Sequence, residues 1–452
     1  MAVCPTTPSA TGSRPASSAD HLTLAPTAGP AGPGGGAREA WSGRHRLALA
    51  GGLTVALLIR VLLLPTDGFR GDIDQFVLWV HGVATTPLGQ AYRQDLSFPP
   101  VMVYLFALLA AVESAFRSAT DASDPAIRAL MKIPATIADI GLALAVAHAL
   151  RERPGRAVGA ALAIALLPAV FYLSAWWGQF ESIFTLAGVA ALLLAISGRD
   201  GAAVVLLAVA LMTKPQALPF VVPFAAWFIA RRGLRGSLPL AAIGAAVVAA
   251  LWLPFLADGG PGAYLGNLAQ VQGDVFAVLS LNAWNLWWLP QLAFGGGSFL
   301  SDGGAIVGPL SPRALGLIAS AGLEIMVFLA VLRRPTARTL TLGLAASVLV
   351  TFTFLTTMHE RYAYAALAFL VLLAAEPLYR WLFIALATVV TLNLVAVAPP
   401  SDEFASLLRV DGPVGVTGAM VMVALTVAVL VLLVRESRQP SPISGASPPR
   451  AP

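Results

Sequence analysis

Long apolar segments between residues 47 and 434 constrain this chain more than any other feature of its sequence. A helix that crosses the bilayer needs about 20 predominantly apolar residues. Segments of that kind run through 47–64, 130–150, 157–175, 181–197, 237–256, 314–332, 338–356, 362–378, 381–398 and 413–434. A further stretch, 202–230, is too long for one straight helix. Because "TKPQ" (213–216) interrupts it with a proline, we expect two short helices that meet there. The sequence therefore predicts an all-α polytopic membrane protein with about twelve transmembrane helices.

The composition supports this class and excludes others. Only 11% of the 452 residues are charged and 58% are hydrophobic, whereas a soluble domain carries about 25% charged residues. The net charge of +5 comes from arginine-rich loops without interleaved aromatic residues, so no nucleic-acid partner is predicted. The single Cys4 excludes an internal disulfide and a cysteine-based metal site. Residues 1–43 and 435–452 are rich in small residues and proline and are predicted to be disordered tails.

Basic clusters predict the topology, because lysine and arginine accumulate in cytoplasmic loops. The clusters are "RERPGR" (151–156), "RRGLR" (231–235), "RRPTAR" (333–338) and the arginines at 435 and 438. With all of them inside, both termini are cytoplasmic and the chain is a multi-pass protein of the plasma membrane. The external face then receives 176–182, 213–216, the long loop 257–313 and 358–364.

This alternation makes a specific prediction for the segment 98–116. "RHR" (44–46) places the N-terminus inside and Asp72 outside, and residue 130 must also start outside. The segment 98–116 is therefore expected to lie in the interface, or to re-enter, within a first external loop at 65–129. The alternative is an ordinary crossing, which would give up the positive-inside pattern downstream. The chain then divides into a membrane module (44–256), the long loop, and C-terminal transmembrane helices (314–434).

Polar side chains gather on the predicted external face. They are Asp72, Asp74, Gln179, Glu181, Lys214, Gln216, His359, Glu360 and Arg361. Lys132 and Asp139 lie seven residues apart on one face of the second span. Each has a purely structural explanation, such as a helix cap, a snorkelling lysine or an interfacial ion pair. Together they indicate a functional site, because polar groups in membrane segments are rare and usually functional.

Carboxylates beside histidine, arginine and lysine suit one kind of chemistry. A carboxylate can take the proton of an acceptor hydroxyl. Cations and hydrogen-bond donors can hold a phosphate leaving group as its charge develops. A lipid-phosphate sugar fits both the polar groups and the apolar walls. A divalent metal held by Asp72 and Asp74 is an open alternative.

Seven short motifs follow one another in a recognisable order. They are "GDIDQFVLW" (71–79), "SFPPVMVY" (97–104), "MKIPATIAD" (131–139), "WGQFES" (177–182), "KPQ" (214–216), "LSLNAWNLWWL" (279–289) and "HERYAY" (359–364). In this order they resemble the GT-C superfamily of glycosyltransferases, multi-spanning enzymes that use polyprenyl-phosphate sugars outside the cytoplasm. The chain is most similar to the dolichyl-phosphate-dependent glucosyltransferases of N-glycan assembly and to bacterial glycosylphosphatidylinositol mannosyltransferase-like proteins. The resemblance covers most of residues 60–375.

The resemblance implies roles for individual residues. Asp72 is implied as the catalytic base, with Asp74 in support, and His359 and Arg361 as the residues that hold the donor phosphate. Asn282 and Trp284, in the aromatic segment of the long loop, are implied as substrate-binding residues. The chain departs from the eukaryotic pattern in having aspartate at 74 for glutamate, glutamine at 179 for histidine, an inserted proline at 215, and arginine at 361 for lysine.

The expected activity is the inverting transfer of a hexose, mannose first, from a polyprenyl phosphate to a glycan, glycolipid or protein acceptor. The resemblance implies no cofactor. Two alternatives belong to other classes. A transporter or flippase could line its path with the same polar groups, and a catalytically inactive relative could serve as a binding partner.

Overall fold

The computed structural model describes residues 40–274, 276–306 and 308–439, and most of the two predicted tails lies outside this range. The described part is helical, with three isolated β-bridges. Its elements are α1 (Gly43–Leu63), α2 (Arg70–Thr85), η1 (Leu88–Arg93), α3 (Pro100–Val112), η2 (Ser114–Arg117), α4 (Pro125–Ala149), α5 (Pro154–Ala165), α6 (Pro168–Phe171), η3 (Tyr172–Trp177), α7 (Glu181–Ile196), α8 (Asp200–Thr213), η4 (Pro215–Phe220), α9 (Val221–Trp252), η5 (Leu253–Asp258), α10 (Gly260–Asp274), α11 (Trp288–Phe294), α12 (Pro312–Arg333), α13 (Ala337–Phe354), α14 (Tyr364–Val371), α15 (Pro377–Val397), α16 (Asp402–Leu407) and α17 (Pro413–Ser437).

Seven apolar helices in the described residues are long enough to cross a membrane, so the chain is a multi-pass membrane protein by length and composition. They are α1, α4, the continuous stretch Pro215–Asp258, α12, α13, α15 and α17. The pair Pro154–Ala165 and Pro168–Trp177, bent by 47°, would make an eighth span. Three further apolar helices, α3, α7 and α8, are shorter. The predicted number of about twelve spans is not reached by this measure and stays a prediction.

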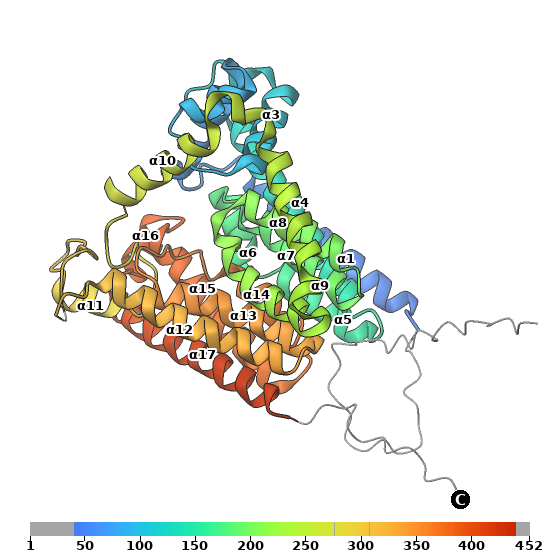
Figure 1. Cartoon of the computed structure of the whole chain (residues 1–452). Coiled ribbons are helices and arrows are strands. Elements are labelled where there is room, and N and C mark those ends of the chain that lie inside the picture. Colours follow the sequence, from blue (N-terminus) through green and yellow to red (C-terminus); the bar gives the residue numbers. More distant parts are fainter. Residues whose placement is uncertain (1–39, 275, 307, 440–452) are drawn as a thin grey trace, which may run out of the picture.

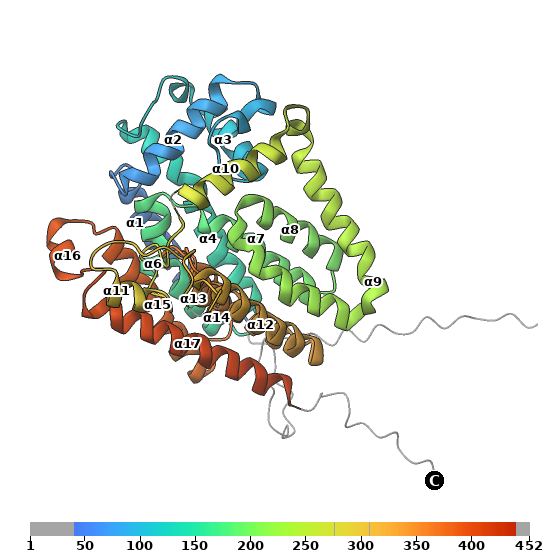
Figure 2. The ribbon, with the colours of Figure 1, turned by 60° about the vertical axis from the view of Figure 1, so that its left-hand side comes forward.

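The predicted break at 213–216 is present. Helix α8 ends at Thr213, Lys214 is extended with φ −155° and ψ 136°, and η4 begins at Pro215. The chain then continues through α9, which changes direction at Gly233, where φ is +69°. Glycine adopts such a left-handed conformation at little cost, so the predicted span 237–256 follows the preceding helix without a separate loop (Figure 2).

The predicted span 362–378 contains a shorter helix than expected. This helix, α14, has only 8 residues and is followed by turns from 372 to 376. Glu376 at the end of these turns pairs with Arg338 at the start of α13, so the segment runs from the loop of His359 to the opposite end of α13, and its crossing of the membrane stays a prediction. Every residue of α14 is buried, and the helix packs among α13, α15 and α7. Its apolar character therefore reflects burial inside protein. Hydropathy does not distinguish a buried helix from one that faces lipid.

The segment 98–116 forms a short helix, α3, followed by the single turn η2. Its 13 residues give a length of roughly 20 Å, short of the roughly 30 Å hydrocarbon core. The hydroxyl of Tyr104 donates to the Leu251 carbonyl at 2.8 Å, which ties α3 to α9. Figures 1 and 2 show α2, α3 and α10 together at one end of the molecule. This length agrees with a helix that does not cross, and its depth in the membrane stays a prediction.

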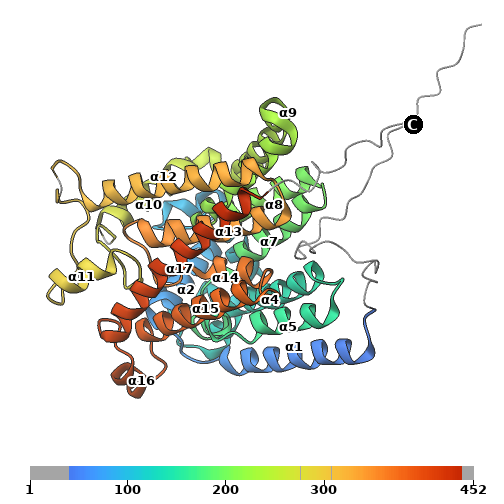
Figure 3. The ribbon, with the colours of Figure 1, turned by 90° about the horizontal axis from the view of Figure 1, so that it is seen from below.

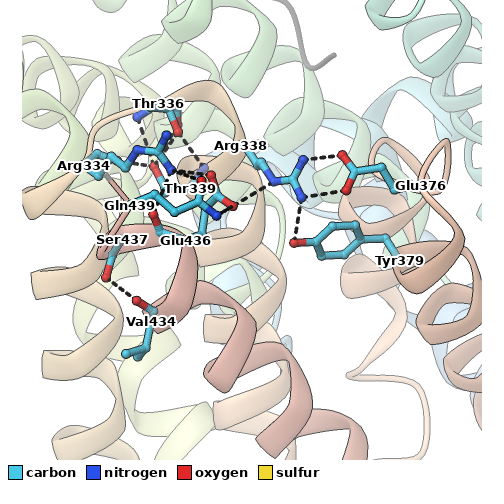
Figure 4. Close-up of polar contacts among 10 residues, drawn as sticks. All are labelled: Arg334, Thr336, Arg338, Thr339, Glu376, Tyr379, Val434, Glu436, Ser437 and Gln439. Carbon is cyan, nitrogen blue, oxygen red and sulfur yellow. Dashed lines mark hydrogen bonds and ion pairs between the residues drawn. The ribbon is translucent and has the colours of Figure 1, made fainter. Parts of the chain in front are cut away.

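The basic clusters lie in pairs near the other ends of the long helices. Trp41 Nε1 donates to the Arg151 carbonyl at 3.0 Å, which joins the N-terminal basic segment to 151–156. Arg334 and Arg338 bind the acids Glu436 and Glu376, and Arg338 also donates to the Tyr379 hydroxyl at 3.1 Å (Figure 4). These contacts tie the ends of α13, α15 and α17. Helix α17 extends to Ser437, so the helix ends two residues beyond the predicted start of the C-terminal tail.

Candidate functional site

Asp72 lies in the first turn of α2, where the chain leaves α1 and passes the segment 176–179. Gly68 makes this passage possible. Its φ is +62°, and a Cβ there would lie 2.1 Å from the Trp176 carbonyl oxygen. Asp72 Oδ2 accepts hydrogen bonds from Trp177 Nε1 at 2.7 Å and from Gln179 Nε2 at 2.6 Å. The Asp72 side chain is 26% exposed. Two side chains of one neighbouring segment thus fix a carboxylate that solvent or substrate can still reach.

The segment that holds Asp72 has an unusual backbone. Residues Tyr172–Trp177 form a π-helical turn, which ends at Gly178 with φ +92°. The amides of Gly178 and Gln179 both donate to the Leu173 carbonyl, at 3.1 and 2.9 Å. A Cβ at Gly178 would lie 3.0 Å from Ile73 Cγ1, so the loop rests directly on the first turn of α2. Single π-turns occur often at functional sites, and this one directs Trp177 and Gln179 toward Asp72.

Lys214 reaches the same place from the break between α8 and η4. Its Nζ donates to Gln179 Oε1 at 3.2 Å and binds Glu181 Oε1. Lys214 and Glu181 are both buried. Gln179 therefore bridges Asp72 and Lys214, with its amide nitrogen on the acid and its oxygen on the lysine.

The "HER" segment completes the cluster from the loop between α13 and α14. Arg361 Nη1 lies 2.6 Å from Glu360 Oε1 and 3.9 Å from Asp72 Oδ2, and its Nε lies 3.5 Å from Glu181 Oε1. Its guanidinium also lies 5.8 Å from the ring centroid of Trp177. One arginine thus faces three carboxylates, and it joins the C-terminal half of the chain to the N-terminal half.

Burial and Arg361 set the charges of this loop. Burial alone would raise the pKa of Glu360, but Arg361, His359 and a backbone hydrogen bond together outweigh it and lower that pKa to about 2. Burial lowers the pKa of His359, and Arg361 lowers it further. His359 is therefore neutral at neutral pH. The carboxylates of Asp72, Glu181 and Glu360 thus face the two basic side chains Lys214 and Arg361.

The tautomer of His359 follows from its neighbour. Arg361 Nη1, which can only donate, lies 3.4 Å from His359 Nδ1, closer than Glu360 Oε2 at 3.7 Å, so Nδ1 is assigned as the acceptor and the proton to Nε2. Nε2 is buried and has no hydrogen-bond partner among the described residues. The site therefore holds one neutral donor that is not used within the protein.

Asp74 lies apart from this cluster. Its carboxylate binds Arg70 at 2.8 Å and accepts from the Ala122 amide at 2.8 Å. Residues two apart on a helix do not share a face, so the pair that the sequence placed at one site is divided. No group of three or more His, Cys, Asp or Glu that could hold a metal occurs in the described part of the chain.

Lys132 and Asp139 also bind elsewhere. Lys132 Nζ donates to the Thr66 carbonyl at 2.8 Å and approaches that of Leu63 at 3.5 Å, so it caps the C-terminal end of α1. Asp139 pairs with Arg60 Nε at 2.9 Å inside the helix bundle. Sequence reasoning missed Arg60, although a lone arginine within the apolar segment 47–64 is a visible signal.

The aromatic segment of the long loop packs directly on the "HER" segment. The Leu281 amide donates to the Met358 carbonyl at 3.0 Å, and Asn282 forms an antiparallel bridge with His359. Asn282 also lines a cavity of about 690 Å³ between α11 and α17. Trp284 is fully buried against α17 and does not face the charged cluster. Gln216 lies beside the Tyr362 hydroxyl.

Five of the predicted residues thus share one cluster with Asp72 at its edge. They are Gln179, Glu181, Lys214, Glu360 and Arg361, with His359 alongside. No family model and no curated protein matches the sequence of this chain.

Proposed function

We propose that this protein is a membrane glycosyltransferase that moves a hexose, mannose first, from a polyprenyl phosphate to a glycan, glycolipid or protein acceptor on the extracytoplasmic face. The observation that carries the proposal is the setting of Asp72. One of its oxygens is held by two neutral donors, and a buried arginine lies 3.9 Å away. A base and a phosphate-binding cation so close together suit the transfer of a sugar from a phosphate to a hydroxyl.

Asp72 acts as the general base in this proposal. Trp177 and Gln179 fix Oδ2, and Oδ1 accepts no hydrogen bond from the described residues, so it is free for an acceptor hydroxyl. The hydroxyl loses its proton to Asp72 as its oxygen bonds to the anomeric carbon. The bond from that carbon to the phosphate oxygen breaks, and the polyprenyl phosphate leaves. Attack from the side opposite the phosphate inverts the configuration.

His359 and Arg361 receive the phosphate. His359 Nε2 and Arg361 Nε are both buried and have no hydrogen-bond partner among the described residues, and Arg361 also supplies positive charge. Because carboxylates already surround Arg361, the phosphate has to compete with Glu360 and Glu181 for this guanidinium. The cavity beside Asn282 provides room next to the same loop.

The test uses the purified full-length protein in phosphatidylcholine vesicles with synthetic polyprenyl-phosphate mannose or polyprenyl-phosphate glucose and a glycolipid extract as acceptor. We expect mass spectrometry to find a hexose added to an acceptor with one of the two donors. Release of polyprenyl phosphate should match the hexose transferred. A protein that consumes neither donor, but moves a fluorescent lipid-linked sugar across the bilayer, would instead be a transporter or flippase.

A further inference from the structure

Glu324 is a second polar feature of the membrane region, far along the chain from the residues of the candidate site. It lies on α12 and is the only charged residue between positions 314 and 332. Ala321, Gly322 and Ile325 around it are exposed on the lipid-facing side, whereas Val327 and Val331 are buried. Glu324 itself is partly exposed. It therefore lies at the boundary between the protein interior and the lipid.

The contacts of Glu324 converge on one hydroxyl. Ser347 Oγ, which is buried on α13, lies 2.7 Å from Glu324 Oε1 and 2.8 Å from Oε2. The same oxygen lies 2.7 Å from the carbonyl oxygen of Pro219 in η4. One hydroxyl thus joins α12 and α13 to the broken helix that follows Lys214.

The number of protons in this arrangement is informative. A serine hydroxyl has one proton to donate. If Glu324 were ionised, that proton could serve the carboxylate or the Pro219 carbonyl, and the other oxygen would face Ser347 Oγ at hydrogen-bond distance with no proton between them. If Glu324 is protonated, the acid donates to Ser347 Oγ and Ser347 donates to Pro219. The neutral acid thus supplies a hydrogen bond to both partners of Ser347, Glu324 and the Pro219 carbonyl, whereas the ionised acid leaves a single proton for the two.

The surroundings agree with a neutral acid. Helices α9, α13 and α17 pack against α12. No charged or titratable group among the described residues of these helices and of η4 pairs with Glu324. Its one side-chain partner there is Ser347. An unpaired carboxylate in the hydrocarbon region is costly. Protonation removes that cost without a basic partner.

We propose that Glu324 is a proton-binding site within the membrane, and that the neutral acid holds η4 in place through Ser347. The chain of donation runs from the Glu324 hydroxyl to Ser347 and from Ser347 to the Pro219 carbonyl. Because η4 begins directly after Lys214, loss of this proton would free the segment that carries the lysine of the charged cluster. The inference does not depend on the proposed transferase activity.

A hydrophobic carbodiimide tests the proposal directly, because it enters the bilayer and reacts with protonated carboxyl groups. The acid oxygen adds to the central carbon of dicyclohexylcarbodiimide, the acid proton passes to a nitrogen, and no group leaves. The full chain in phosphatidylcholine vesicles at neutral pH should carry this adduct on Glu324 in peptide mass spectrometry. Glu376 is the internal control, since it is partly exposed but ion-paired with Arg338, and it should stay unmodified.

The opposite labelling pattern would overturn the proposal. An unmodified Glu324 that reacts instead with a water-soluble carbodiimide and an amine would be ionised and hydrated. Equal modification of Glu324 and Glu376 would also count against it, because Glu324 would then react no more readily than a glutamate that is ion-paired with arginine. In Glu324→Gln the adduct at this position must disappear.

A second measurement keeps the test independent of reagent access. The infrared band of a protonated carboxyl should be present in the native protein and reduced in Glu324→Gln. The glutamine amide can donate to Ser347 as the acid does, so Glu324→Gln should keep the native thermal midpoint, whereas Glu324→Ala and Ser347→Ala should lower it. If the glutamine variant loses as much stability as the alanine variant and the infrared band is unchanged, Glu324 does not act as the donor.

Discussion

At the scale of single residues, the two aspartates of "GDID" separate clearly. Asp72 contacts Trp177, Gln179 and Arg361, whereas Asp74 holds Arg70 and a backbone amide of the loop before α4. Both carboxylates are about equally exposed, at 26% and 33%. Their different partners, and not their accessibility, therefore predict different roles.

Replacing Asp72 with asparagine should abolish turnover while the protein still folds. Asparagine keeps the size of the side chain and can accept the same hydrogen bonds, but it cannot take the acceptor proton. Loss of a general base costs about 10²–10⁴-fold in rate. Asp74→Asn is the matched control and should lower thermal stability more than turnover. Near-normal turnover in Asp72→Asn, measured with the donor that the native protein uses, would rule out this residue as the base.

Removing the imidazole of His359 should weaken donor binding. His359 Nε2 has no partner among the described residues. Glu360, which His359 Nδ1 approaches at 3.7 Å, keeps its ion pair with Arg361, so His359→Ala removes a donor and leaves no buried acid unpaired. A hydrogen bond to a charged group is worth roughly 1.5–3 kcal/mol, which corresponds to a loss of affinity of about tenfold to a hundredfold. Titration with polyprenyl phosphate measures this directly, with Asp74→Asn as a control. Unchanged affinity would place the phosphate elsewhere.

The "HER" loop should make the fold sensitive to acid. The pKa of Glu360 falls from 4.5 to about 2 in the folded protein, so its contribution is present above about pH 4.5 and is lost as the pH falls toward about 2. The pKa of His359 is also lowered from 6.5 in the folded protein. As the pH falls below 6.5, this histidine takes up a proton in the unfolded chain but stays neutral in the folded chain. Both effects lower stability in acid.

Thermal midpoints in detergent across the acidic range measure this effect. The midpoint should decline below about pH 6.5, and His359→Gln should flatten the part of the decline between about pH 6.5 and 5. Glu360 titrates below that part, so its effect is separable. A His359→Gln profile that parallels the native one would contradict the direction given for this histidine.

The sequence predicted which residues belong to the cluster, but it did not predict which groups each of them contacts. The order of motifs placed Gln179, Glu181, Lys214 and Arg361 on one face, and the structure brings them together. It assigned Lys132 to the substrate, although the lysine caps α1, because a pattern of residue types does not show which backbone carbonyls end nearby. The π-turn that orients Trp177 depends on packing against α2, which no local pattern encodes.

At the scale of elements, the buried pair of Arg60 and Asp139 links α1 to α4. Arg60 also donates to the Ala56 and Ala165 carbonyls at 2.9 and 2.8 Å. Asp139 accepts from Ser174 of the π-turn and lies 3.4 Å from the Tyr364 hydroxyl of α14. The pair therefore joins the segment that holds Asp72 to the one that follows "HER".

Breaking this pair on one side should cost more than removing it. Arg60→Leu leaves a buried carboxylate unpaired, a change that costs about 3–5 kcal/mol in other proteins. The double variant Arg60→Leu/Asp139→Leu removes both charges and should recover part of the lost stability. Thermal unfolding of the native, single and double variants in one detergent tests this. A double variant less stable than Arg60→Leu would mean that the carboxylate contributes through Ser174 and Tyr364 more than the charge costs.

The helices themselves were largely predictable. The apolar periods, the break at Lys214 and the bend at Gly233, which falls in the basic segment 231–235, correspond to elements of the structure. The shortness of α14 does not follow from hydropathy. Its apolar residues pack against other helices of the protein, which the hydropathy of the segment does not show. Figure 3 shows the contrast, with α1 at the edge of the molecule beside α5 and α14 among other helices.

At the scale of the whole molecule, the basic clusters and the charged site lie at opposite ends of the helices. Helix α1 begins next to Arg44 and ends just before Asp72, and its 21 residues span roughly 31 Å, about the thickness of the hydrocarbon core. The same separation holds for α13, which runs from Arg338 to the loop of His359. A single orientation therefore places every basic cluster on one side and the site on the other.

Cysteine labelling tests this orientation together with the placement of α3. Cys4 is replaced by serine, and single cysteines are introduced at Asp95, Ser118 and Arg235, all exposed positions. An impermeant maleimide added to intact cells should label positions 95 and 118, which flank α3, and should label position 235 only after the membrane is opened. Labelling of 95 without 118 would mean that α3 crosses the membrane. In that case the basic segment 151–156 would lie outside, and the positive-inside pattern that supports an extracytoplasmic site would fail from α4 onward.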